Sequence, residues 1–142
     1  MTIHGAIEQV DILCPNMIST EQKIKWLSLL DVRVFREIVL THEDAPVDEN
    51  NEIIYFAGYN GEVDEETVLL VPDDFADIYR YYLEAKICQS NNEIKRYNNA
   101  MMSYNTEWVN YQNYYNRTHM PVQKAGYFKF YEPQKRNWFT GV

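Results

Sequence analysis

The chain has 142 residues, 46% of them hydrophobic, which is enough for one domain with a core of its own. Its formal net charge of −8 argues against non-specific binding to nucleic-acid phosphates, although DNA could still pass through a channel that such a protein lines. No apolar run approaches the roughly 18 residues of a membrane span, and no signal peptide is recognisable. We expect the two cysteines, Cys14 and Cys88, to be reduced.

Two amphipathic helices are predicted first. An apolar stripe over residues 2–13 indicates a short helix, which a proline ends. Ser19 begins a capping box for a second helix, which reaches about Leu40. On this second helix we expect the apolar residues to face inward, and Lys23 and the other basic residues to stay in solvent.

The composition then changes. Residues 43–71 contain nine acids and neither Lys nor Arg. Two strand candidates, residues 53–57 and 67–71, are separated by an Asn-Gly turn signal. We therefore predict an acidic β-hairpin inserted over residues 43–71, between the second and third helices.

A long helical region is expected after Pro72. Its first apolar stripe is out of phase with a later seam, so we favour two helices with a break near residues 90–92 over one rod. Ser90, with Glu93 three residues on, gives a second capping box. The later seam repeats at alternating spacings of three and four residues: Ile94, Tyr97, Met101, Tyr104, Trp108, Tyr111 and Tyr115. This aromatic seam is either the core of a helical domain or, in part, a contact with another subunit.

The C-terminal residues 122–142 form an arm of different composition, with four basic residues and one acid. The arm carries six aromatic residues and a basic pair that suit an interface: Tyr127, Phe128, Phe130, Tyr131, Lys135, Arg136, Trp138 and Phe139. The arm either folds back on its own helices or docks on a neighbouring subunit, and we favour docking.

A search for catalytic and metal-binding patterns finds none. The three histidines lie in different segments, neither cysteine belongs to a Cys/His signature, and all five glycines are isolated. The acidic run that starts at Asp48 lacks the glycine of a calcium loop, because Ile53 stands at that position. We therefore predict no catalytic residue, no metal, no cofactor and no enzymatic activity.

The layout of roughly residues 1–120 resembles the small helical head–tail connector (adaptor) proteins of tailed bacteriophages and prophages. The likeness rests on two amphipathic helices, a variable segment, and a Leu-Val-Pro-Asp step from Leu70 to Asp73. A helix with Ile78, Tyr81, Tyr82 and Ala85 follows, and a last long helix ends in the run from Tyr114 to His119. The resemblance lies in the order of the predicted elements, because that family has no catalytic motif that a sequence could match.

The predicted elements together indicate a mainly α fold, a bundle of about four helices in residues 1–121 with the acidic hairpin inserted and the arm at 122–142, and this agrees with the resemblance. The resemblance also implies a ring, commonly of twelve copies, that is made in the host cytoplasm and becomes part of the virion neck. The ring would sit below the portal protein and continue the channel through which the double-stranded genome passes, without sequence-specific binding. Its other side would dock a stopper or tail-completion protein, and no membrane is involved.

For the subunit contact, we expect Glu62, Asp64, Glu65 and Glu66 to meet Lys135 and Arg136 of a neighbour. An alternative within the neck is a stopper or tail-completion protein, but such proteins are by analogy richer in β-structure. A different class is a small acidic inhibitor that mimics nucleic acid.

Overall fold

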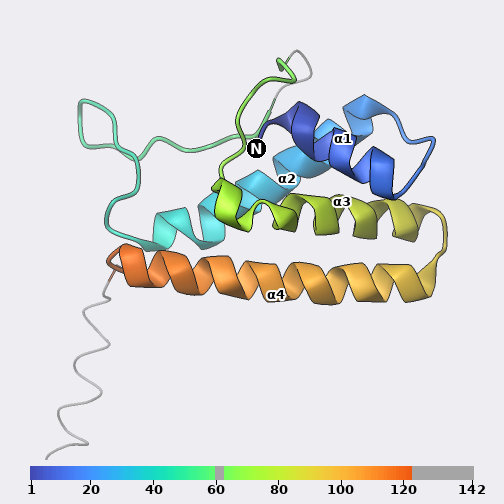
Figure 1. Ribbon diagram of the computed structural model, residues 1–142. Coiled ribbons are helices and arrows are strands. Elements are labelled where there is room, and N and C mark those ends of the chain that lie inside the picture. Colours follow the sequence, from blue (N-terminus) through green and yellow to red (C-terminus); the bar gives the residue numbers. More distant parts are fainter. Residues whose placement is uncertain (60–62, 123–142) are drawn as a thin grey trace, which may run out of the picture.

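The computed structural model describes residues 1–59 and 63–122, and these contain four α-helices (Figure 1). The helices are α1 (Ile3–Leu13), α2 (Thr20–Glu37), α3 (Asp77–Ser90) and α4 (Ile94–Thr118), with short 3₁₀ turns at Val39–Thr41 and Asp73–Phe75. The predicted mainly α class is confirmed.

The first two helices begin where side chains cap them. The Thr2 hydroxyl accepts a hydrogen bond from the Gly5 N–H at 3.1 Å, and the Ser19 hydroxyl accepts one from Gln22 at 3.3 Å. Each cap satisfies a backbone donor that has no partner within the helix. Both helices and the Ser19 cap were predicted from the sequence, and they are confirmed.

One expectation on α2 is wrong, because Lys23 is buried and only 3% exposed. Lys23 lies one turn before Leu27, on the inner face of the helix. Its ammonium group is 2.5 Å from a carboxylate oxygen of Asp11, near the end of α1. A buried charge with a partner is tolerated, and this ion pair joins the end of α1 to the start of α2.

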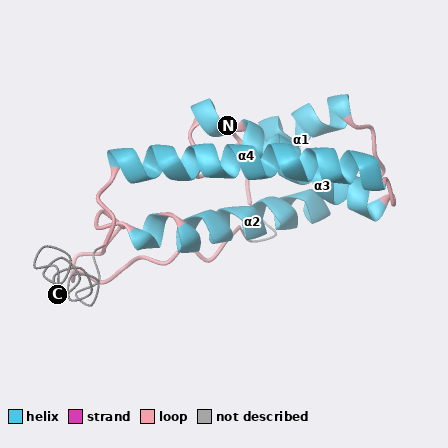
Figure 2. Ribbon diagram, turned by 90° about the horizontal axis from the view of Figure 1, so that it is seen from below, coloured by secondary structure: helices cyan, strands magenta, loops and turns pink. Residues whose placement is uncertain are grey.

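The break between α3 and α4 was also predicted, and it is confirmed. Asn92 takes a positive φ of 58°, which Asn tolerates better than most residues, and the chain reverses there. α4 then runs back antiparallel to α3 (Figures 1 and 2). The predicted capping box is wrong, because the Ser90 hydroxyl donates to the Lys86 carbonyl within the last turn of α3. Glu93 holds the cap position of α4 without a side-chain bond.

The aromatic seam of α4 lies largely in the chain's own core. Its second half is buried: Tyr104, Trp108, Tyr111 and Tyr115. Tyr97 and Met101 are partly buried, and Ile94 at the start of the helix is 71% exposed. The asparagines of α4 all lie on its exposed side: Asn98, Asn99, Asn105, Asn110, Asn113 and Asn116. The interpretation of the seam as a core is therefore confirmed for its second half.

The predicted β-hairpin is not confirmed, because the described parts of residues 53–57 and 67–71 do not pair with each other. Residues 67–69 pair instead with the start of the chain, through hydrogen bonds from Ile3 to Thr67 (3.0 Å) and from Leu69 to Met1 (2.9 Å). Residues before α1 thus satisfy backbone groups that the hairpin would have used.

Candidate interaction surfaces

The acidic residues predicted at the subunit contact gather in one exposed turn. Asp64, Glu65 and Glu66 lie beside the first turn of α1. The Glu65 carbonyl accepts a hydrogen bond from the His4 N–H at 2.9 Å, and its carboxylate is 3.2 Å from the His4 ring. The other predicted contact residues lie outside the described residues: Glu62, Tyr127, Phe128, Phe130, Tyr131, Lys135, Arg136, Trp138 and Phe139.

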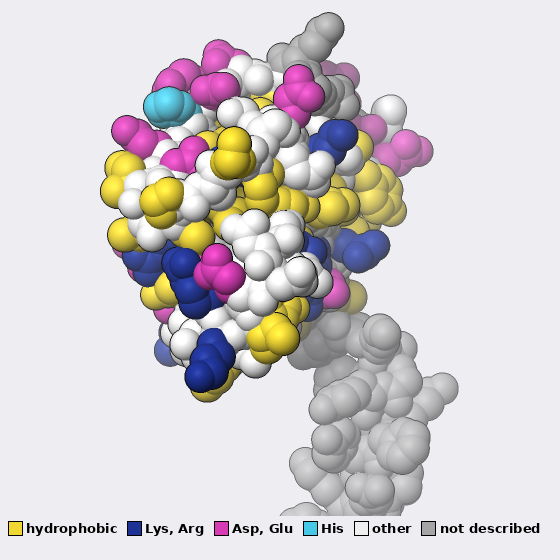
Figure 3. All heavy atoms as spheres, turned by 90° about the vertical axis from the view of Figure 1, so that its right-hand side faces the viewer, with side chains coloured by type: hydrophobic (Ala, Val, Ile, Leu, Met, Phe, Trp, Pro, Cys, Tyr) yellow, Lys and Arg dark blue, Asp and Glu magenta, His cyan; other side chains and the backbone are white. Residues whose placement is uncertain are grey.

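Negative charge is concentrated in one part of the molecule. Residues 43–77, here called the acidic segment, hold twelve acids and neither Lys nor Arg. The nine basic residues of the described chain all belong to α2, α3 and α4. On the face drawn in Figure 3, Asp and Glu gather toward the top, whereas Lys and Arg lie mostly in the lower half. Eight acids outside the acidic segment balance most of these nine bases, so the described chain combines one strongly acidic segment with a nearly neutral helical body.

The acidic segment is attached to the helices through a buried carboxylate, Asp31 of α2. Its Oδ1 accepts a hydrogen bond from the Tyr79 hydroxyl at 2.6 Å. Its Oδ2 accepts from the Tyr59 hydroxyl and from the Leu70 N–H, the latter at 3.2 Å. The Tyr79 hydroxyl in turn accepts from the Val71 N–H at 2.8 Å. Because every oxygen has a donor, Asp31 joins both ends of the segment 59–71 to α2 and α3.

The environment of Asp31 perturbs all three acidic groups in this network. Burial raises the pKa of Asp31, although the hydrogen bonds from Tyr59, Tyr79 and Leu70 oppose the shift. Burial also raises the pKa of Tyr59 and of Tyr79, and the neighbouring Asp31 raises both further. Each phenol therefore remains a hydrogen-bond donor far above neutral pH. This network was not predicted from the sequence, although the position of Asp31 between Leu27 and Val34, on the inner face of α2, was a usable signal.

A second polar cluster holds the end of α4, next to the point where residues 123–142 begin. His42 is buried; its Nε2 lies 2.8 Å from the Asn116 amide oxygen and its Nδ1 lies 2.6 Å from the Ile38 carbonyl. His119 stacks on the Tyr115 ring, with 3.9 Å between ring centroids, and its Nε2 is 3.2 Å from an Asp44 carboxylate oxygen. These contacts fix the start of the acidic segment against the last turn of α4.

A cation–aromatic cluster joins α2 to α4. The Arg33 guanidinium lies over the Trp108 ring at 4.6 Å and donates to the Tyr104 hydroxyl at 3.1 Å. Burial raises the pKa of Tyr104 to about 12, although Arg33 opposes the shift. The cluster holds these aromatic side chains in place through directional contacts, in addition to the burial of their rings.

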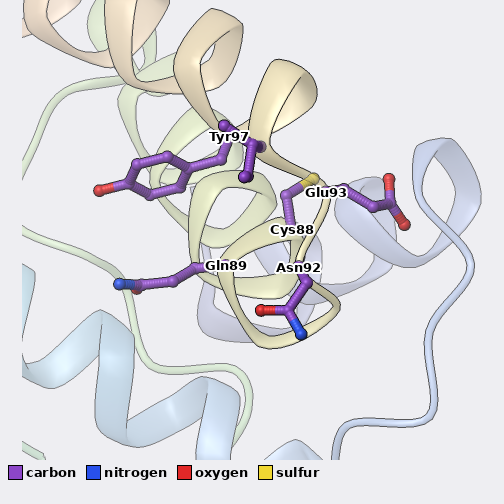
Figure 4. A pocket seen from close by; sticks show the side chains of 6 residues that line it. Cys88, Gln89, Asn92, Glu93 and Tyr97 are labelled. Atoms are coloured by element: carbon purple, nitrogen blue, oxygen red, sulfur yellow. The ribbon is translucent and has the colours of Figure 1, made fainter.

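The pocket at the α3–α4 turn does not have the arrangement of a catalytic site. It measures about 140 Å³ and is lined by Cys88, Gln89, Asn92, Glu93, Ile94 and Tyr97. In Figure 4, Tyr97 and Gln89 extend to one side and Glu93 to the other, so the polar groups do not converge. Cys88 is buried, and this burial raises the pKa of its thiol to about 11. A protonated thiol is a poor nucleophile.

Metal-binding and membrane-spanning features were also sought in residues 1–59 and 63–122. No group of three or more His, Cys, Asp or Glu in these ranges could hold a metal ion. None of the helices there combines the length and the apolar character needed to cross a bilayer.

Comparison with known proteins gives no assignment. No protein-family model, no curated protein and no solved structure is significantly similar to this chain.

Proposed function

We propose that this chain is a non-enzymatic structural protein of a phage neck: a head–tail connector of the adaptor type, whose subunits form a ring below the portal. The observation that carries the proposal is the uneven charge along one chain, with twelve acids and neither Lys nor Arg in residues 43–77 and four basic residues against one acid in residues 122–142. A ring has a heterologous interface, so each subunit must present two different, complementary surfaces.

The helical body supports the same proposal. The aromatic seam of α4 and the Asp31 network hold the four helices and the acidic segment in a fixed arrangement. A rigid frame lowers the conformational entropy lost on assembly. A lumen formed by a protein with an excess of acids would let the DNA backbone pass without gripping it.

The proposed lateral contact places the C-terminal arm of one subunit on the turn that contains Asp64, Glu65 and Glu66 of the next. These three acids are exposed, so they are accessible to a neighbour. The arm supplies Lys135 and Arg136 together with aromatic anchors of the kind that dominate interface energies.

The decisive experiment is native mass spectrometry of the chain, alone and mixed with the portal protein encoded near it. We expect a ring, either alone or on the portal with a matching copy number. A strict monomer that does not bind the portal would refute the connector function.

The arm contact has its own test, in which Lys135→Glu and Arg136→Glu are combined and assembly is followed at low salt. We expect assembly to be lost, and reversal of Glu65 and Glu66 to lysine to restore it. The matched control reverses two helical charges, Lys25→Glu and Arg117→Glu, and should assemble normally. Unchanged assembly of the arm variant would refute the contact, because unscreened charges act most strongly at low salt.

An acidic inhibitor that mimics nucleic acid is the second candidate, and the concentration of twelve acids in one segment favours it. Inhibition of a nuclease or polymerase by the monomer, together with failure to bind the portal, would support this candidate.

A further inference from the structure

Residues 47–55 form a loop that projects at one end of the molecule (Figure 1), and several of its apolar side chains are exposed to solvent. The loop is closed by its own hydrogen bonds, from the Asp48 N–H to the Glu52 carbonyl at 2.8 Å and from the Ile54 N–H to the Pro46 carbonyl at 2.9 Å. The Asp48 carboxylate also accepts from the Glu52 N–H at 2.9 Å. The shape of the loop thus comes largely from bonds within it.

Four apolar side chains of this loop are exposed: Val47 (49%), Ile53 (41%), Ile54 (51%) and Tyr55 (70%). Single exposed apolar residues are ordinary, but a group of them on one projection indicates a contact surface. Three acids, Asp48, Glu49 and Glu52, accompany them, and the loop has no Lys or Arg.

The opposite end of the molecule carries a second exposed apolar group, here called the apolar tip. It consists of Ile12 (71%), Leu13 (56%), Met17 (103%) and Ile94 (71%). The loop that follows α1 and the turn from α3 to α4 lie at the same end in Figure 1, and Figure 3 views this end with hydrophobic side chains spread across it.

One base beside the apolar tip, Lys95, is opposite in charge to the acids of the projecting loop. The start of α4 carries Lys95 and Arg96, both exposed, against one acid, Glu93. Arg96 lies 3.0 Å from the Glu93 carboxylate and 3.8 Å from that of Glu84, so its charge is balanced, whereas Lys95 has no ion-pair partner among the described residues. The loop, in contrast, has three acids and no base.

We propose that the projecting loop of one copy docks on the apolar tip of a second copy, in a head-to-tail contact. The two surfaces lie at opposite ends of the chain, so a subunit cannot join them within itself (Figure 1). Apolar side chains meet apolar side chains, and the acids of the loop face Lys95 of the next copy. This contact deepens the ring proposed above and rests on it; the C-terminal arm is a poorer occupant of the tip because its four basic residues would repel Lys95.

A complementation experiment tests a head-to-tail contact directly. The loop variant combines Ile54→Asp with Tyr55→Asp, and the tip variant combines Ile12→Asp with Met17→Asp. All four residues are exposed, and circular dichroism checks that each variant retains its fold. Sedimentation velocity at low salt then measures association of the full chain.

We expect the wild-type chain to associate, with weaker association at high salt, and each variant alone to be monomeric. An equal mixture should form a one-to-one dimer and nothing larger, because each variant keeps the surface that the other lacks. The control variant combines Met102→Asp with Val109→Asp, which changes two exposed residues on the outer side of α4 by the same charge, and it should associate like wild type.

Three results would overturn the contact: a wild-type chain that stays monomeric up to about 1 mM, the weak limit of specific binding; variants that associate like wild type; or a mixture that stays monomeric. The portal experiment separates this inference from the proposed function. If the loop and tip variants still form a ring on the portal, only the head-to-tail contact fails. If the wild-type chain does not join the portal, the connector function fails.

Discussion

Replacing Asp31 by alanine removes both oxygens that accept hydrogen bonds from Tyr59, Tyr79 and Leu70. Leaving a buried donor without an acceptor lowers the free energy of unfolding by about 1–3 kcal/mol. Tyr59 is only partly buried and can turn to water, so we expect a total loss of about 3–5 kcal/mol in the free energy of unfolding. That is a large part of the ~5–15 kcal/mol that stabilises a typical domain.

Asparagine at the same position should cost less, about 1–2 kcal/mol, because it keeps one acceptor oxygen and its amide can donate to the Tyr79 hydroxyl. Urea unfolding followed by circular dichroism measures both variants. Asp74→Ala, at an exposed acid, is the control and should change stability by less than about 0.5 kcal/mol. The reasoning is refuted if the alanine variant lies within about 1 kcal/mol of wild type, or is no less stable than the asparagine variant.

The same position predicts a dependence on pH. Burial raises the pKa of Asp31, so the folded protein holds this proton more strongly than the unfolded chain does. The stabilisation by protonated Asp31 is complete below the pKa of this side chain in the unfolded chain, about 4. It is lost as the pH rises through the higher pKa that Asp31 has in the folded protein. The stability difference between wild type and Asp31→Asn should therefore shift against wild type as the pH rises from acid toward neutral. If the free energies of unfolding of the two proteins run parallel as functions of pH, this expectation is contradicted.

Three further predictions concern other parts of the molecule. His42→Ala should cost about 2–3 kcal/mol in urea unfolding, because it removes a buried ring that packs edge-on against Tyr115 and leaves a cavity, whereas His4→Ala at an exposed site should cost little. Gly58→Ala should cost more than about 1 kcal/mol, because its φ is +98° and a Cβ would lie 2.3 Å from the Ser28 hydroxyl; a cost near zero would contradict the observed loop path. Burial raises the pKa of Cys88 to about 11, so its thiol should react with a disulfide reagent at pH 8 about 100-fold more slowly than in denaturant, and equal rates would contradict its burial.

The helices could be predicted from the sequence wherever the signal is local. The Ser19 cap and the apolar stripe of α2 depend on residues one or two turns apart, and both were predicted correctly. The break near Ser90 follows from two stripes that are out of phase. The Ser90 cap was predicted wrongly, since a serine near a helix end can bond forward to an N–H or backward to a carbonyl, and here it bonds to Lys86.

The contacts that the sequence did not reveal are long-range. Thr67 and Leu69 pair with the start of the chain, and no local turn signal could indicate that. Asp31 was not singled out, because its partners come from α3 and from the segment 59–71. The apolar tip likewise required the packing of α1 against α3 to be known.

The pairing of Ile3 with Thr67 also has a consequence for the order of folding. The two residues are 64 positions apart, so joining them costs about 4 kcal/mol of chain entropy, whereas α3 and α4 meet through a short turn. On the ribosome, α1 is synthesised first, but its backbone partners at residues 67–69 and its neighbour α3 emerge much later. The α3–α4 pair can therefore form as a local unit. The pairing of the start of the chain with residues 67–69 is expected to form later, although the start of the chain is synthesised first.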